Sequence, residues 1–171
     1  MERRSVEAIV GALDAAGTRY LIVGGLAVAA HGYVRFTADI DIVLDPASEA
    51  LRAAIEALRG LDYRPRAPVT IEEFADPAKR ARWTREKGLT VFSLFSDLHP
   101  ATEIDLFVEP PFDFVSAHAR AARFEIAPGL QATFVGLADL IDMKRAAGRP
   151  QDHQDLEALL ALRPSEEGAN E

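Results

Sequence analysis

The sequence has no cysteine among its 171 residues. This absence excludes a disulfide framework, a thiolate metal site and a cysteine nucleophile. It is also typical of proteins in a reducing compartment, so we expect a cytoplasmic location.

Long apolar runs are missing as well. The stretch from Leu21 to Ala30 is apolar enough to suggest a secretion signal, but Gly24-Gly25 interrupts it and charged residues precede it. No stretch approaches the roughly 20 apolar residues that a membrane span requires. We expect a soluble protein with no membrane partner.

Positive charge is scarce overall. The formal net charge is -8 and the pI is about 5.0, which argues against tight nonspecific binding to nucleic acid. The hydrophobic content of 49% suits a globular chain with a substantial core. We predict a single domain over residues 1–163 and a disordered tail over residues 164–171.

Hydrophobic periodicity and turn residues predict an α+β fold, a small mixed sheet flanked by helices. Asp45-Pro46 supplies an N-cap and a first-turn proline for a helix that runs to about Arg59. The other expected helices cover residues 4–16, 26–31, 137–147 and 152–162, and the expected strands cover 20–23, 38–44, 89–95, 102–108, 124–126 and 131–134. The strands over 89–95 and 102–108 should form a hairpin, and the last two should lie at an edge of the sheet.

One basic segment runs from Arg64 to Lys87 and contains Trp83. An RNA-contacting or nucleotide-stacking loop would use such residues. The interpretation that we favour is a solvated helical insertion with Trp83 packed inward.

Two carboxylates share one face of the strand predicted over residues 38–44. In Asp39-Ile40-Asp41-Ile42 the acids alternate with isoleucines, so both acids point one way and both isoleucines can enter the core. Ordinary polar positions on a half-solvated strand give the same pattern, which makes it weak evidence by itself.

The strand predicted over residues 102–108 repeats this alternation. Asp105 and Glu103 lie on its polar face, and we favour Asp105 as the functional acid because two apolar residues flank it. Three carboxylates on neighbouring strands can hold two divalent cations about 4 Å apart, which align a triphosphate and activate a hydroxyl. We predict Asp39, Asp41 and Asp105 as catalytic residues and ligands of Mg2+, with Mn2+ as the alternative ion.

A glycine turn precedes these acids. Gly24-Gly25 follows a strand and opens a helix, where backbone N–H groups can approach a phosphate. The alternative is a plain tight turn. Thirteen residues separate Gly25 from Asp39.

This order and spacing resemble the signature of nucleotidyltransferases of the DNA polymerase beta superfamily, in which Gly-Gly or Gly-Ser precedes an Asp-X-Asp strand and one later acidic strand position. The neighbouring residues His31, Arg35 and Thr37 are most similar to the AbiEii and MenT toxin group. The resemblance covers most of residues 20–160 and implies the nucleotidyltransferase fold.

The resemblance also implies roles for the site residues. Gly24 and Gly25 would hold the phosphates of an NTP substrate, and Asp39 and Asp41 would bind metal and nucleotide. Asp105 would complete the metal site and accept the proton of the acceptor hydroxyl.

Four further residues are expected near the nucleotide. Arg35 and Thr37 precede the acidic strand, and Arg35 could pair with phosphate or with one of the acids. Lys144 lies on the apolar face of its helix, where it must reach a cleft or snorkel, and the resemblance implies a triphosphate ligand. Asp152 is the later motif residue or, equally, an N-cap. His31, at the end of a short helix, is predicted to be structural.

The sequence supports three functional hypotheses. The first is Mg2+-dependent transfer of a nucleoside monophosphate from NTP to an acceptor hydroxyl, on tRNA, by a toxin-like component of a bacterial toxin-antitoxin or defence system with a cognate antitoxin. The second is transfer to a small molecule, as in lincosamide and aminoglycoside nucleotidyltransferases, which the acidic pI suits. The third is a non-catalytic nucleotide- or protein-binding module with the same fold.

Overall fold

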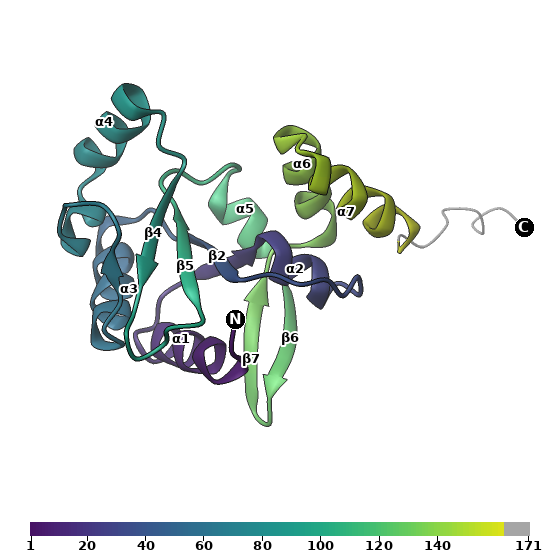
Figure 1. The fold of residues 1–171 in the computed structure, drawn as a ribbon, viewed down its shortest axis with the longest axis horizontal. Coiled ribbons are helices and arrows are strands. Elements are labelled where there is room, and N and C mark those ends of the chain that lie inside the picture. The colour runs from purple at the N-terminus through teal and green to yellow at the C-terminus, as the bar shows by residue number, and fades with distance from the viewer. Residues whose placement is uncertain (163–171) are drawn as a thin grey trace, which may run out of the picture.

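The computed structural model describes residues 1–162, and the tail predicted over residues 164–171 lies outside them. Its centre is a mixed seven-stranded sheet in the order β3-β4-β5-β2-β1-β7-β6 (Figure 1). The strands are β1 (Tyr20–Val23), β2 (Asp39–Leu44), β3 (Arg64–Pro65), β4 (Val91–Phe95), β5 (Glu103–Phe107), β6 (Ala122–Ala127) and β7 (Leu130–Phe134). The α+β architecture predicted from the sequence is confirmed.

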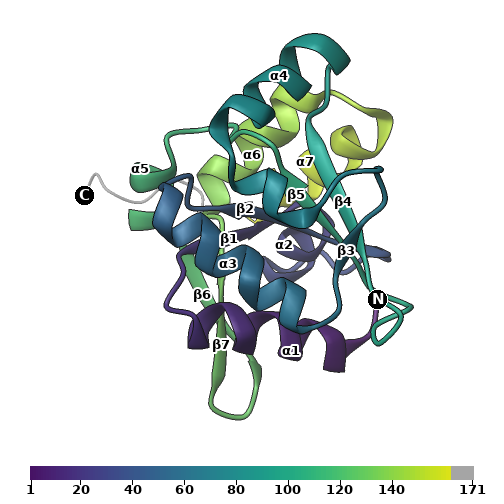
Figure 2. The same cartoon turned by 90° about the vertical axis from the view of Figure 1, so that its left-hand side faces the viewer.

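Helices flank the sheet. They are α1 (Arg3–Ala15), α2 (Gly24–Ala30), α3 (Ser48–Gly60), α4 (Pro77–Lys87), α5 (Phe114–Ala119), α6 (Leu137–Ala147) and α7 (Pro150–Ala161), with a 3-10 turn η1 (Ile71–Ala75). Helices α1 and α3 lie next to each other, and α6 and α7 form a separate pair (Figure 2). Helix α2 packs on β1 and β2 and touches α6, so it stands between the sheet and that pair.

The centre of the sheet positions the candidate site. Strand β1 is buried at every residue, and it pairs antiparallel with β2 and parallel with β7. Strand β2 pairs on its other side with β5, in parallel. The start of β2 therefore lies beside the end of β1, where the chain turns at Gly24.

Most of the predicted elements are confirmed to within two or three residues, including the antiparallel hairpin of β4 and β5. The prediction that both late strands lie at an edge was wrong for β7, because it pairs with β1 as well as with β6. Of these two late strands, only β6 lies at an edge of the sheet. Helix α2 begins at Gly24 rather than at Leu26.

The start predicted for α3 was also wrong. The helix begins at Ser48 with Ala47 as its N-cap, and Asp45 lies outside it. Asp45 accepts a hydrogen bond from the Ala47 backbone N–H over 2.9 Å and pairs with Arg19, whose Nη2 lies 2.6 Å from Asp45 Oδ2. Asp45 therefore lies two residues before the N-cap and is paired with Arg19 instead of capping the helix.

Trp83 in the basic segment is packed inward, as predicted. Its side chain is buried and stacks on Phe92, with ring centroids 5.3 Å apart and planes 6° apart. Several cations of the segment are also paired internally: Lys79 with Glu73, Arg66 with Glu103 and Arg64 with Asp97. Trp83 is therefore not available for nucleotide stacking.

Candidate active site

Asp41 and Asp105 are direct neighbours on the two central strands. The parallel register of β2 and β5 pairs Asp41 with Asp105 and Asp39 with Glu103. The residues that alternate with these acids are fully buried in the core: Ile40, Ile42, Ile104 and Leu106. The three candidate carboxylates therefore leave the sheet on one and the same face.

The charges of these carboxylates repel one another. Burial, followed by the negative charges of Asp105 and Asp39, raises the pKa of Asp41 to about 6. The pKa of Asp39 is raised as well, first by burial and then by Asp105 and Glu103. Lys144 and Arg149 act in the opposite direction on Asp41 without cancelling the rise. A bound cation would relieve this repulsion.

A serine on the adjoining strand orients Asp105. Ser93 lies opposite Asp105 in the register of β4 and β5, and its hydroxyl donates a hydrogen bond to Asp105 Oδ1 over 2.5 Å. Sequence reasoning missed Ser93, although its polar position between Phe92 and Leu94 in an alternating strand was a usable signal.

Glu103, the competing candidate for the third acid, is engaged elsewhere. Arg66 holds it with two hydrogen bonds, one of them from Nε to Oε2 over 2.8 Å. The bond from Arg66 lowers the pKa of Glu103. Its negative charge is therefore already balanced, whereas the only hydrogen bond to the Asp105 carboxylate within residues 1–162 comes from the neutral Ser93 hydroxyl.

Gly24 is in direct contact with Asp41. Its φ is +62°, and a Cβ at this position would lie 1.9 Å from Asp41 Oδ2. Only glycine allows both the left-handed backbone and this close approach. The turn between β1 and α2 therefore fixes where the Asp41 carboxylate can lie.

We expect Gly24→Ala to disable the site more than it destabilises the fold. The new methyl group must displace the Asp41 carboxylate, and a displacement on the order of 1 Å costs about 100-fold in activity. Gly17→Ala is the matched control, since Gly17 has a φ of +65° but no atom within 4 Å of a Cβ. Activity assays and thermal melts of both variants test this, and equal losses of activity would contradict it.

Gly25 is packed against the loop that leads into β2. A Cβ at Gly25 would lie 2.9 Å from Arg35 Nη2 and 2.9 Å from Thr37 Oγ1. Thr37 in turn donates a hydrogen bond to the Asp39 carbonyl over 3.2 Å. The structure thus brings Gly25, Arg35 and Thr37 together beside the acidic strand.

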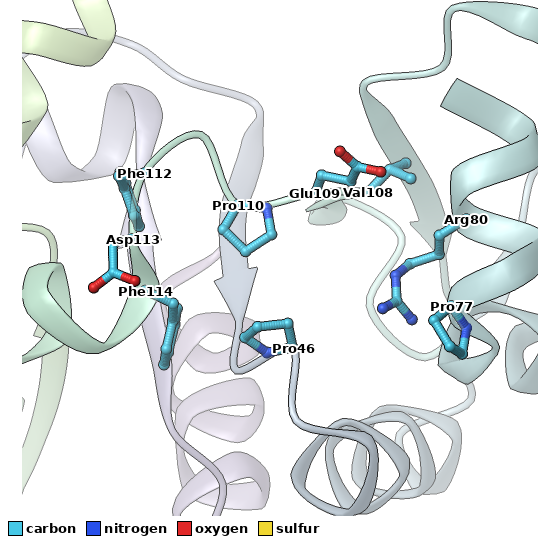
Figure 3. A pocket seen from close by; sticks show the side chains of 9 residues that line it. All are labelled: Pro46, Pro77, Arg80, Val108, Glu109, Pro110, Phe112, Asp113 and Phe114. Carbon is cyan, nitrogen blue, oxygen red and sulfur yellow. The ribbon is translucent and has the colours of Figure 1, made fainter. Parts of the chain in front are cut away.

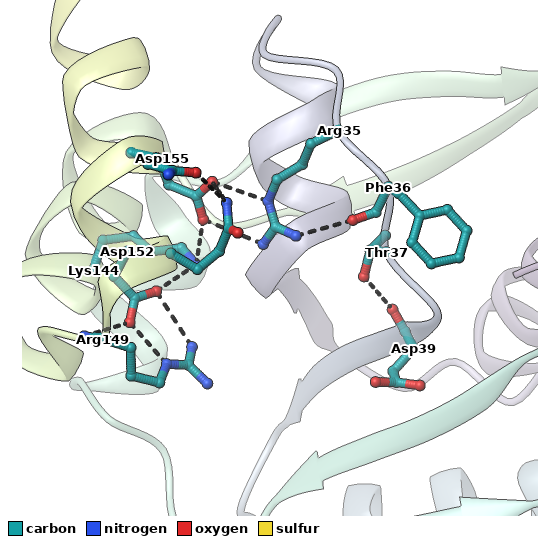
Figure 4. A network of polar contacts seen from close by, with 10 residues as sticks. Arg35, Phe36, Thr37, Asp39, Lys144, Arg149, Asp152 and Asp155 are labelled. Atoms are coloured by element: carbon teal, nitrogen blue, oxygen red, sulfur yellow. Dashed lines mark hydrogen bonds and ion pairs between the residues drawn. The ribbon is translucent and has the colours of Figure 1, made fainter.

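A buried set of ion pairs joins α6, α7 and the same loop (Figure 4). Lys144 Nζ lies 2.8 Å from Asp152 Oδ1 and 2.8 Å from Asp155 Oδ2. Arg35 Nε lies 2.9 Å from Asp155 Oδ1, and Arg149 Nε lies 2.8 Å from Asp152 Oδ2. We call these five residues the ion-pair cluster. Sequence reasoning missed two of them, Arg149 and Asp155.

In the ion-pair cluster, Lys144 and Asp152 are buried and bind each other. The Lys144 side chain is 5% exposed and lies between two carboxylates that are 0% exposed. Asp152 accepts a hydrogen bond from the Arg149 backbone N–H over 3.1 Å, so it caps α7 from the third position of the helix rather than as the N-cap. Arg149 has a side chain that is 72% exposed. It is the cation of the cluster that a ligand can reach.

His31 has the structural role that the sequence suggests. Its Nε2 lies 2.8 Å from the Val135 carbonyl oxygen, and its ring meets the edge of Phe124. These contacts tie the end of α2 to β6 and to the residue that follows β7.

The donor chemistry of the candidate site suits Mg2+. Within residues 1–162, no three His, Cys, Asp or Glu side chains are grouped so that they could hold a metal ion, and this includes Asp39, Asp41 and Asp105. Protein-bound Mg2+ usually takes one or two carboxylates and completes its shell with water and substrate phosphates. The Asp41 and Asp105 pair fits this mode, because both groups are hard oxygen ligands and lie on adjacent strands.

Two cavities lie away from the carboxylates. One, of about 410 Å³, lies past the C-terminal ends of β2 and β5 (Figure 3). Its wall includes Pro46, Val108, Phe114 and Arg80, and the Arg80 guanidinium is already bonded to the Phe74 carbonyl over 2.6 Å. The second cavity, of about 500 Å³, lies at the start of β1.

Solved structures share this architecture. The antibiotic-resistance factor ANT(2'')-Ia matches with a TM-score of 0.55 and 16% identity, over 93% of this chain and 82% of that one. The chain has the nucleotidyltransferase fold. An antigenic nucleotidyltransferase-like protein from Paracoccidioides brasiliensis matches with a TM-score of 0.57 and 14% identity, over 94% of this chain and 74% of that one. At the level of sequence, neither a family model nor a curated protein matches.

The helices of this nucleotidyltransferase fold are short. Within residues 1–162, none has both the length and the apolar character needed to cross a membrane.

Proposed function

We propose that the protein is a Mg2+-dependent nucleotidyltransferase, which transfers a nucleoside monophosphate from an NTP to an acceptor hydroxyl. The observation that carries the proposal is the pairing of Asp41 with Asp105 across parallel strands, against a glycine whose place no other residue could take. The nucleotidyltransferase fold supports it independently.

The residues of the candidate site suit the chemistry of this transfer. The acceptor oxygen forms a bond to the α-phosphorus, and the bond from that phosphorus to the pyrophosphate oxygen breaks. Asp39 and Asp41 would hold the metal ion and the nucleotide, and Asp105, oriented by Ser93, would receive the proton of the acceptor hydroxyl. A bound Mg2+ or Mn2+ would supply the positive charge that stabilises the transferring phosphoryl group.

Arg149 is the side chain that we assign to the triphosphate, together with the backbone of Gly24 and Gly25. Its positive charge acts on Asp41, and most of its side chain is exposed. Lys144 already satisfies two buried carboxylates, so we give it a positioning role: it holds the start of α7, and with it Arg149, in place.

For the acceptor we favour RNA, and specifically tRNA, as expected for a toxin-like enzyme with a cognate antitoxin. The loop before β2 presents Phe36, whose side chain is 85% exposed. The Phe36 carbonyl accepts a hydrogen bond from Arg35, which the ion-pair cluster holds, so the backbone that carries the exposed ring is restrained on the loop leading to Asp39 (Figure 4). An exposed aromatic ring on a restrained backbone suits an unpaired base.

A cationic small molecule is the second candidate acceptor. The net charge of -8 and the structural similarity to ANT(2'')-Ia favour it. Against it, the acids that surround the candidate site are already paired: Glu103 with Arg66, Asp152 with Lys144, and Asp155 with Arg35. These pairs leave few carboxylates to bind amino groups.

Incubation with labelled NTPs tests the proposal. We expect label in tRNA only when Mg2+ or Mn2+ is present, and no label in a panel of aminoglycosides and lincosamides. Label in a drug would replace the RNA acceptor and keep the reaction. No label in any acceptor, with nucleotide binding that does not depend on Mg2+, would indicate the non-catalytic module instead.

We expect Phe36→Ala to weaken the acceptor step alone. Loss of one stacked base costs about 1–3 kcal/mol, so the KM for tRNA should rise about 5- to 150-fold while the KM for NTP stays unchanged. Leu98→Ala is the control, because Leu98 is also exposed, at 69%, but lies in the turn between β4 and β5. An unchanged KM for tRNA would remove Phe36 from the acceptor site.

A further inference from the structure

The cavity at the start of β1 lies at the far end of the strand from the glycine turn. Residues of α1, β1, α5, β6 and β7 line it, among them Asp14, Arg19, Tyr20, His118, Arg123 and Thr133. Three residues separate Tyr20 from Gly24, which places the cavity roughly 13 Å along the strand from the turn. Its volume of about 500 Å³ is within the range of small-molecule sites.

An unsatisfied polar group forms part of the wall. The Tyr20 side chain is 2% exposed, and its hydroxyl lies near Asp14 and Thr133 but makes no well-aligned hydrogen bond within residues 1–162. Leaving a buried hydroxyl poorly bonded is costly, so the Tyr20 hydroxyl can donate to a ligand in this wall at little loss.

Positive groups converge on the same cavity. Arg123 projects from β6 and forms no ion pair within residues 1–162. Arg19 faces it from the start of β1, although its charge is shared with Asp45. The positive charges of Arg19 and Arg123 both disfavour the protonated form of His118, which lies on α5. The charge of Arg123 also acts on the Asp14 carboxylate of the same wall, but the two side chains form no ion pair within residues 1–162.

We propose that this cavity binds a small molecule carrying a phosphate or carboxylate group, with the anion between Arg123, His118 and the Tyr20 hydroxyl. Guanidinium, imidazole N–H and phenol O–H are all donors to such a group. Asp14, on the same wall, supplies an acceptor for a hydroxyl or amine elsewhere on the ligand. Bound there, the molecule would bridge α1, α5 and the β6–β7 hairpin.

The pKa of His118 should report whether an anion binds in this cavity. Burial, followed by the charges of Arg19 and Arg123, lowers the pKa of His118, and the smaller effect of Asp45 opposes this. An anion next to Arg123 must offset these positive charges. Its binding should therefore raise the pKa of His118.

NMR titration of the full-length protein with inorganic phosphate, and separately with succinate, tests the site without any NTP. We expect saturable shifts of the His118 ring signals and an upward shift of its pKa with at least one of the two anions. The exposed His153 on α7 should respond to neither. The two arms distinguish a phosphate ligand from a carboxylate ligand.

Substitutions of the proposed donors show whether the anion binds in this cavity. Arg123→Gln and Tyr20→Phe each remove one donor and should weaken binding about tenfold or more, since a hydrogen bond to a charged group contributes about 1.5–3 kcal/mol. Arg145→Gln, on the exposed face of α6, should bind as the wild type does. A response that is linear in salt, equals that of sodium chloride, or persists in Arg123→Gln would overturn the proposal.

Discussion

Asp41→Asn should abolish nucleotidyl transfer and at the same time make the protein more stable. A residue that acts within a catalytic unit typically costs about 1000-fold or more in kcat when its chemistry is removed. The rise in the Asp41 pKa from 3.8 to about 6 means that its ionised form is unfavourable in the folded state. The neutral amide keeps the shape of the side chain and removes the repulsion from Asp105 and Asp39.

The raised pKa of Asp41 sets both the size and the pH dependence of the stability gained in Asp41→Asn. A rise of about 2 pKa units corresponds to about 3 kcal/mol at most, and relaxation of the partly solvated site should reduce the measured gain to about 1–3 kcal/mol. Because the pKa in the folded state lies above that of the unfolded chain, ionisation costs stability as the pH rises. The gain should be absent below pH 3.8 and complete above about pH 6.

Thermal and urea melts without metal, at several pH values, measure the gain. Asp142→Asn is the matched control, since Asp142 is an exposed residue whose change should shift the free energy of unfolding by less than about 0.5 kcal/mol. A variant that keeps transferase activity, or that loses activity only because it unfolds, would contradict a catalytic role for Asp41.

Lys144→Met should have the largest effect on stability. It leaves the carboxylates of Asp152 and Asp155 buried with one partner fewer, and breaking a buried ion pair in this way costs about 3–5 kcal/mol. In a chain of this size, that loss lowers Tm by roughly 10 °C. Arg145→Met changes the adjacent, exposed residue and should cost less than about 0.5 kcal/mol.

Lys144→Met should also change how the free energy of unfolding depends on pH in the acid range. Burial tends to raise the pKa of Asp152, but the bonds from Arg149 and Lys144 outweigh it, so the pKa is lowered. Asp152 therefore contributes stability above its unfolded pKa, and this stability is lost as the pH falls through 3.8 and below. The loss should be smaller in Lys144→Met. A melting curve like that of Arg145→Met would show that the ion-pair cluster contributes little to stability.

The carboxylate face was predictable because it depends on local periodicity. Alternation of acids with isoleucines places Asp39 and Asp41 on one face of a strand wherever that strand lies in the sheet. The glycine turn was also readable, since a strand, two glycines and a helix follow one another directly. The contact between Gly24 and Asp41 was not, because it depends on the register of β1 with β2.

The features that sequence reasoning missed depend on contacts between distant segments. The partners of Lys144 come from the next helix, and Arg35 joins them from a loop 120 residues away from Asp155. Helix α5 has six residues and β3 has two, which is too short for a periodic pattern. Asp45 was assigned to a helix N-terminus because nothing local reveals its pairing with Arg19 across 26 positions.

Calorimetric titration of each NTP into the wild type and Asp39→Ala, with Mg2+ and with EDTA, tests the central claim most directly. The claim is that Asp39, Asp41 and Asp105 together bind a metal ion and a nucleotide. It predicts saturable binding of at least one NTP to the wild type with Mg2+, and a marked loss of that binding both in EDTA and in Asp39→Ala. Binding of equal affinity under all of these conditions, or no binding to the wild type with Mg2+, would contradict it.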